Sequence, residues 1–70
     1  MDKFNLRAGE EYIELNNLLK MLGWAATGGE AKLRIDDGEV LVNDQKETRR
    51  RKKLRSGDVI SFGEERITIA

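Results

Sequence analysis

Apolar residues in the first part of the chain recur at helical spacing. Between Glu10 and Leu22 they stand three or four residues apart, at Tyr12, Leu15, Leu18, Leu19 and Leu22. This spacing predicts a helix from Glu10 to Leu22 with one apolar face. Gly23 follows where a glycine commonly ends a helix.

A second helix has a recognisable start. Thr27 and Glu30 are spaced as a capping box, in which the Thr27 hydroxyl accepts from the Glu30 amide and the Glu30 carboxylate accepts from the Thr27 amide. One face of the helix then carries two apolar residues, Ala31 and Ile35. Gly38 stands where a left-handed C-cap belongs, so the helix is predicted over residues 28–37.

After Gly38 the apolar period changes from helical to two, which indicates strands. Val40 and Val42 alternate with their neighbours, Asn43-Asp44 suits a tight turn, and a returning strand is predicted from about Lys46. Other short strands are predicted at Lys3–Leu6, Val59–Phe62 and Arg66–Ile69. The last two follow a turn at Ser56-Gly57-Asp58 and are joined by a loop at Gly63-Glu64-Glu65.

The predicted order is β-α-α-β-β-β-β, which defines an α+β fold. We expect one domain over residues 1–70, in which two N-terminal helices pack on a small, mostly antiparallel β-sheet. The residues expected in the core include four aromatics, Phe4, Tyr12, Trp24 and Phe62. A monomer is expected, although an exposed last strand ending at Ala70 could pair with a second copy.

Composition excludes several classes of protein. With no cysteine, neither a disulfide framework nor a thiolate metal site can form. No apolar run approaches the roughly 20 residues that span a bilayer, and the first residues lack the apolar core of a signal peptide. We therefore expect a cytoplasmic protein without a membrane partner.

Catalytic chemistry has few candidate residues. Histidine is absent, which removes the commonest general base near neutral pH and the commonest metal ligand. Four carboxylates lie close in sequence, at Asp36, Asp37, Glu39 and Asp44. They fall where a helix ends and a hairpin turns, so we interpret them as solvated turn acids rather than as a hydrolase or metal site. No enzyme activity, metal or cofactor is expected.

Positive charge is concentrated in one segment of a chain whose formal net charge is zero. The window 46–55 holds seven basic residues against one acid, Glu47, a net of +6. The basic residues are Lys46, Arg49, Arg50, Arg51, Lys52, Lys53 and Arg55. Such a segment favours binding to a polyanion. It could also be a solvated edge that keeps strands from pairing, or a surface that docks an acidic protein.

A strand through this segment would divide its charges between two faces. If Leu54 points to the core, alternation places Thr48, Arg50 and Lys52 on its side. The other side then carries a row of four cations, Arg49, Arg51, Lys53 and Arg55. Because unpaired charge is costly to bury, an irregularity in this strand is expected.

An ordered set of short patterns resembles a known family. They are Leu15-x-x-Leu18-Leu19-Lys20, Gly23, Ala31-Lys32 with Ile35, Gly38-x-Val40-x-Val42-Asn43, and Leu54-x-x-Gly57-Asp58-x-Ile60. Together they resemble the RNA-binding domain first described in small-subunit ribosomal protein S-four, the αL motif, over residues 12–62. The chain is most similar to the small stand-alone members of the YbcJ type.

The resemblance implies a non-catalytic RNA-binding protein. Its contacts would go mostly to phosphates of a structured RNA, with ribosome-associated or RNA-processing proteins as further partners. The residues expected to bind RNA are Gly28, Gly29, Lys32, Arg49, Arg50, Arg51, Lys52 and Lys53. Larger family members have Ser-Arg at the start of the second helix, whereas this chain has Gly28-Gly29, which either seats a phosphate or is purely structural.

Overall fold

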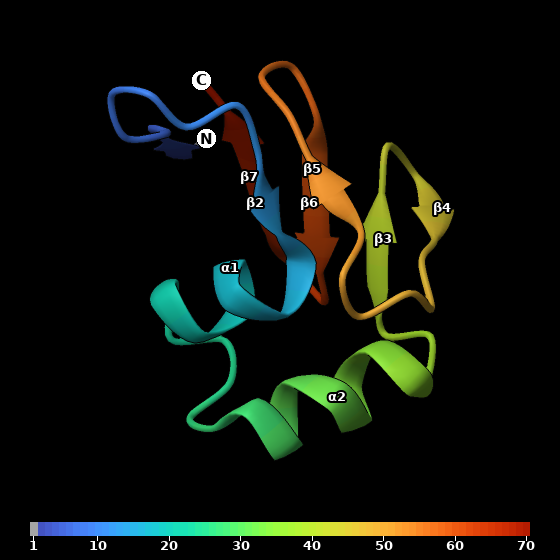
Figure 1. Cartoon of the computed structure of the whole chain (residues 1–70). Coiled ribbons are helices and arrows are strands. Elements are labelled where there is room, and N and C mark those ends of the chain that lie inside the picture. Colours follow the sequence, from blue (N-terminus) through green and yellow to red (C-terminus); the bar gives the residue numbers. More distant parts are fainter. Residues whose placement is uncertain (1) are drawn as a thin grey trace.

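A five-stranded sheet and a separate two-stranded ribbon hold the chain together (Figure 1). The computed structural model describes residues 2–70. Its elements are β1 (Asp2–Phe4), β2 (Ile13–Glu14), α1 (Leu15–Met21), α2 (Gly28–Asp36), β3 (Val40–Val42), β4 (Gln45–Lys46), β5 (Lys53–Leu54), β6 (Val59–Phe62) and β7 (Glu65–Ile69). Two strands precede the helices, so the predicted order, with the helices ahead of all but one strand, was wrong.

The sheet is mixed, with the strand order β1-β7-β6-β3-β4. Neighbours from β7 to β4 pair antiparallel, whereas β1 runs parallel to β7. Because β1 pairs with the outer side of β7, the last strand is not an edge of the sheet, and the expectation that it is exposed there was wrong. The ribbon pairs Ile13 with Leu54 and Glu14 with Lys53, antiparallel.

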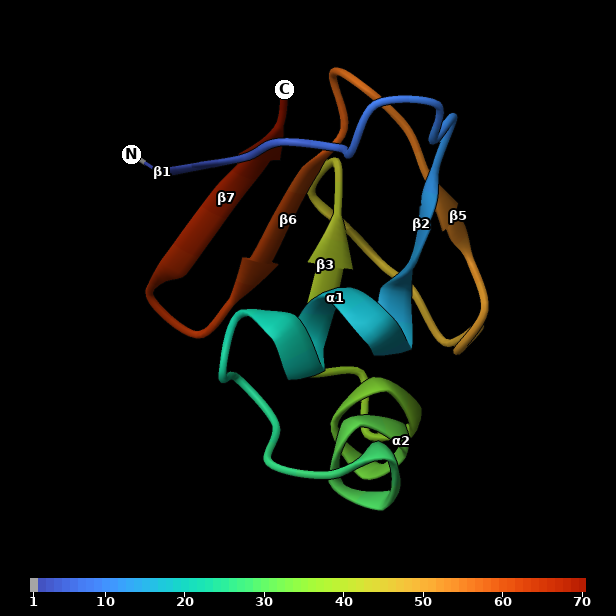
Figure 2. The same cartoon turned by 60° about the vertical axis from the view of Figure 1, so that its left-hand side comes forward.

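The core lies between the sheet and the ribbon, and the two helices close one end of it (Figure 2). Ile13 and Leu54 enter it from the ribbon, and Leu15, Leu18 and Leu19 from α1. The fully buried residues of α2, β3 and β6 are Ala31, Ile35, Val40 and Ile60. The predicted core aromatics Phe4, Trp24 and Phe62 lie half-buried against this cluster, and the Trp24 and Phe62 rings are 5.8 Å apart.

The first helix begins later than its apolar spacing predicts. Glu14 is extended (φ −75°, ψ 143°), and the helix starts at Leu15. Ile13, the residue before Glu14, pairs with Leu54 far along the chain, so this part of the predicted helix forms a strand instead. The end agrees with the prediction, because Gly23 adopts φ +77°.

The second helix and the hairpin after it agree with the sequence. α2 has Asp37 as its C-cap, and Gly38 adopts φ +74°, which an L side chain rarely tolerates. Asn43 and Asp44 both have positive φ, 53° and 67°, as a two-residue turn between β3 and β4 requires. The returning strand is short, however, because it ends at Lys46.

Candidate nucleic-acid interface

The basic segment leaves the sheet after β4 and crosses to the start of α1. Glu47 donates its backbone amide to the Val40 carbonyl at 3.1 Å, and residues 47–52 then form no strand. The Leu15 amide donates to the Lys52 carbonyl at 2.9 Å, and the Asn16 amide to the Arg50 carbonyl at 3.0 Å. The first amides of a helix have no acceptor within the helix, so the loop carbonyls supply the acceptors for the Leu15 and Asn16 amides. The same bonds fix the path of the loop.

This path changes the predicted distribution of charge. A regular strand from Lys46 to Leu54 does not form, so the predicted row of alternating cations was wrong, and the expected irregularity is confirmed. Instead, four cations from both predicted faces line one hollow of about 370 Å³: Arg49, Arg51, Lys52 and Lys53. Arg50 is also exposed, in the turn between them. We call residues 49–53 the basic cluster.

Two half-buried carboxylates hold arginines of the basic cluster in place. Arg51 Nε lies 3.2 Å from Glu14 Oε2, and the Arg51 side chain remains 80% exposed. Arg49 donates from Nε, at 3.0 Å, and from its backbone amide to one oxygen of Glu47, and from Nη2 at 3.2 Å to the other. These bonds from Arg49 lower the pKa of Glu47 against the opposing effect of burial, and they raise the pKa of Arg49. Both guanidinium groups are therefore oriented by a carboxylate while they remain open to solvent.

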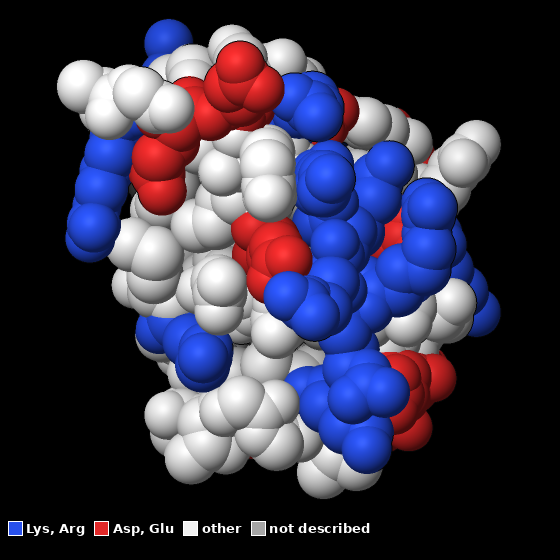
Figure 3. Space-filling model, in the orientation of Figure 1, with Lys and Arg blue, Asp and Glu red and all other residues white. Residues whose placement is uncertain are grey.

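Positive side chains form a continuous strip on one face of the molecule (Figure 3). The strip passes over β5 and the connection from β4, and it reaches α2 at its lower end. α2 carries two cations, Lys32 and Arg34. Arg34 is engaged with Glu39 at 3.3 Å and with the Phe62 ring at 5.7 Å. Lys32 is exposed and forms no ion pair with any described residue.

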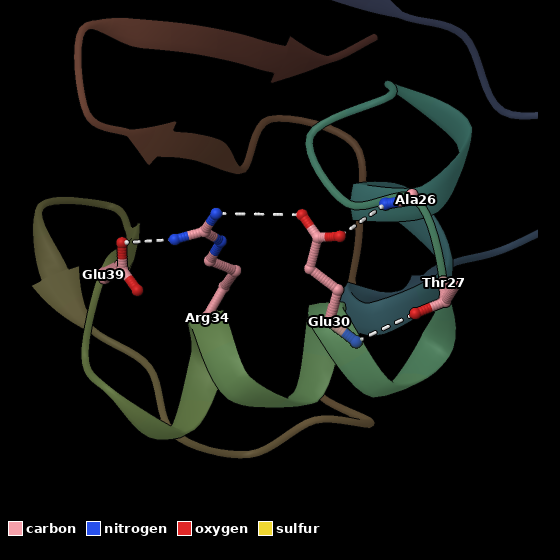
Figure 4. Close-up of polar contacts among 5 residues, drawn as sticks. All are labelled: Ala26, Thr27, Glu30, Arg34 and Glu39. Atoms are coloured by element: carbon pink, nitrogen blue, oxygen red, sulfur yellow. Dashed lines mark hydrogen bonds and ion pairs between the residues drawn. The ribbon is translucent and has the colours of Figure 1, made fainter.

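The start of α2 is capped by its own side chains (Figure 4). Thr27 Oγ1 accepts from the Glu30 amide at 3.1 Å, as predicted. The Glu30 carboxylate accepts from the Ala26 amide at 3.4 Å rather than from Thr27, so the second half of the predicted capping box was wrong by one residue. Gly28 and Gly29 are exposed, and added Cβ atoms would meet nothing closer than 3.9 Å. Nothing in the fold around them requires glycine.

Tyr12 was assigned to the core by its helical spacing, and this assignment was wrong. Its side chain is 37% exposed, with Lys53 Nζ 5.0 Å and Arg55 Cζ 5.6 Å from the ring centroid. A strand reading of residues 12–15 explains this, because Ile13 and Leu15 turn inward while Tyr12 and Glu14 turn outward. Strand alternation over residues 12–15, rather than helical spacing, would have predicted that the Tyr12 side chain is exposed.

The acidic residues from Asp36 to Asp44 do not gather into a site. Glu39 pairs with Arg34, and Asp44 lies 3.6 Å from Arg66 Nη2. Within residues 2–70, no group of three potential metal-ligating side chains comes together. No described helix has the length and apolar character to cross a membrane.

Comparison with known proteins finds relatives over most of the chain. The family model of the S4 domain matches residues 5–70. The Escherichia coli (strain K12) protein named "Putative RNA-binding protein YbcJ" is 43% identical over 51 residues, 73% of each chain. The Bacillus subtilis (strain 168) protein named "Probable ribosome maturation protein RlbA" is 44% identical over 52 residues, 74% of this chain and 73% of its own.

A solved structure shares the whole fold. The solution structure of YbcJ from E. coli, described as revealing an αL motif involved in RNA-binding, covers 100% of this chain and 87% of its own. The two share 36% sequence identity with a TM-score of 0.71. The two helices and the mixed sheet are thus the arrangement of that αL fold.

Proposed function

This chain belongs to the S4 domain family, and from that premise we propose that it binds RNA through the basic cluster and the adjoining surface of α2. One observation carries the proposal. The loop that holds the cluster is fixed by backbone hydrogen bonds to α1, so its cations line a defined hollow rather than a mobile tail. Because the backbone that carries these cations is already ordered, less freedom is lost when they meet a phosphate.

Arginine and lysine would contribute differently to this surface. Arg49 and Arg51 have planar donor groups that fit phosphate oxygens, and the carboxylates behind them hold these groups in place. Lys32 would add a point charge from α2, and the exposed Gly28-Gly29 turn would let a backbone approach closely. Contacts of this kind orient an RNA without reading its bases, so selectivity would come from the shape of a structured RNA.

The protein would act by binding, without catalysis. The name of the B. subtilis relative connects that protein with ribosome maturation. We extend this to the present chain as a target class, namely structured RNA of the ribosome or its precursors. An acidic protein docked on the same cations is the competing outcome.

Charge reversal at three positions tests the proposal. Arg51→Glu reverses a cation of the cluster, Lys32→Glu reverses one on α2, and Arg66→Glu, the control, reverses an arginine of β7 that lies beside Asp44. Binding of a fluorescein-labelled RNA hairpin is measured by anisotropy at physiological salt. Each lost phosphate contact should weaken binding by roughly fivefold, and a reversed charge by more. Arg66→Glu should change it less than about twofold.

Two results would contradict the proposal. Equal losses for all three variants would mean that total charge alone matters. An absence of hairpin binding at low salt, together with tight binding of a polyglutamate peptide, would favour an acidic protein partner.

A further inference from the structure

We propose that Tyr12 is a stacking platform for one unpaired nucleobase of the RNA. The inference rests on the proposed RNA binding and adds to it a requirement for an unpaired nucleotide beside the backbone held by the basic cluster. It starts from the outer face of the β2–β5 ribbon. Ile13 and Leu54 fill the core from the inner face, while the outer face carries an aromatic ring next to cations.

The Tyr12 ring makes no contribution to the hydrophobic core. Its ring is not part of the buried cluster, whereas its neighbour Ile13 is 8% exposed. Lys53 and Arg55 flank Leu54 on the opposite strand and place their charged groups over the Tyr12 ring. Proteins that bind single-stranded nucleic acids combine exposed aromatic rings with cations, because bases stack on the rings and phosphates meet the charges.

The two cations over the Tyr12 ring do not prevent a base from stacking on it. Both side chains are exposed and sit on flexible stems, so they can leave the ring when a base arrives. The charged groups of Lys53 and Arg55 would then contact the phosphates on either side of that nucleotide. Arg51 lies close by, since its partner Glu14 pairs with Lys53 in the ribbon. The stacked base and the phosphates on the basic cluster would therefore belong to one stretch of RNA.

A hollow beside Tyr12 favours a base over a phosphate. Its volume is about 490 Å³, and it is lined by residues 9–14 and Asn17. The three carboxylates in this lining, Glu10, Glu11 and Glu14, would repel a phosphate but accept from base N–H groups. Glu10 already accepts from the Arg7 amide and Glu14 from Arg51, whereas Glu11 has no hydrogen bond to any described residue. Glu11 is the acceptor available to the edge of a base.

Two RNA hairpins with the same stem separate stacking from phosphate binding. One carries a single bulged 2-aminopurine nucleotide, and the other a bulged abasic nucleotide with the same backbone. Stacking on an aromatic side chain should give the wild-type protein about tenfold higher affinity for the first hairpin. The 2-aminopurine emission should fall on binding, as it does when that base stacks.

Three variants assign the effect to the ring. Tyr12→Leu keeps an apolar side chain without the flat ring, and it should bind both hairpins with the affinity of the wild type for the abasic one. Tyr12→Phe should keep the preference, and Arg51→Ala should weaken both hairpins alike. Thermal melting of each variant confirms that it is folded.

Equal binding of the two hairpins by the wild type would overturn the stacking platform and leave the proposed RNA binding intact. A preference that persists in folded Tyr12→Leu would also overturn it. If neither hairpin binds at low salt, the proposed function itself fails.

Discussion

The salt dependence of RNA binding follows directly from the cations that line the hollow. Four of them, Arg49, Arg51, Lys52 and Lys53, face one space. If each neutralises one phosphate, the slope of log affinity against log salt should be about −3 on single strands and nearly −4 on duplex RNA. Affinity should then fall by about 50- to 150-fold between about 50 and 200 mM salt.

Removal of one cation should make this slope shallower by about 0.7 to 0.9, the contribution of one neutralised phosphate. Arg51→Ala leaves three contacts, so the slope should be about −2 to −3, and the same salt change should cost about 20- to 40-fold. The fold should persist, because the Arg51 side chain is 80% exposed and its pair with Glu14 contributes only about 0–1 kcal/mol.

The assay is a series of anisotropy titrations of one labelled RNA hairpin at four salt concentrations, for the wild type and Arg51→Ala. Urea unfolding of both proteins provides the control for stability. Equal slopes for the two proteins, or a wild-type slope near zero, would refute the reasoning that these cations each neutralise a phosphate.

Other predictions concern the fold and the carboxylates that support the site. Leu19→Ala should lower the free energy of unfolding by about 2–5 kcal/mol in urea titrations, because this side chain is fully buried and its loss leaves a cavity. Bonds from Arg49 lower the pKa of Glu47, so the stability from this carboxylate should be present above its ordinary pKa of 4.5 and be lost as pH falls through its lower folded pKa. In Glu47→Gln this acid-dependent loss should shrink, and an unchanged stability profile against pH would contradict the role of Glu47. Glu14→Gln should lower affinity for an RNA hairpin because Arg51 loses the carboxylate that orients it, and anisotropy that shows unchanged or tighter binding would contradict this role of Glu14.

Local signals in the sequence were enough for the second helix and its hairpin. Thr27 caps α2 through a bond between residues three apart, and Asn43-Asp44 closes a turn within two residues. Such features depend on neighbours in the chain, so the sequence displays them directly. The strands β3, β6 and β7 were likewise visible from their alternation, to within one residue.

Elements with distant partners could not be predicted in the same way. β2 and β5 contain two residues each and exist because Ile13 meets Leu54, which lies far along the chain. A run this short has no period of its own, and Tyr12 also fits the helical spacing of the leucines after it. The parallel pairing of β1 with β7 joins the two ends of the chain and gives no local signal either.

The candidate site was visible as charge but not as shape. The basic residues 49–53 stand out in a neutral chain, yet their gathering around one hollow depends on the bonds from Leu15 and Asn16 to the loop. A strand through the same residues would have turned Lys52 away from Arg51. The exposed Tyr12 ring was missed for the same reason, because the ribbon that presents it was not predicted.

The central claim is that one surface, built from the basic cluster and α2, contacts RNA. Amide chemical-shift mapping tests it most directly, since every backbone N–H of this small protein can be followed while an RNA hairpin is titrated. The account predicts that the largest shifts occur in residues 49–55 and around Lys32, with small shifts on β7. Shifts concentrated on β1 and β7, with residues 49–55 unchanged, would contradict it.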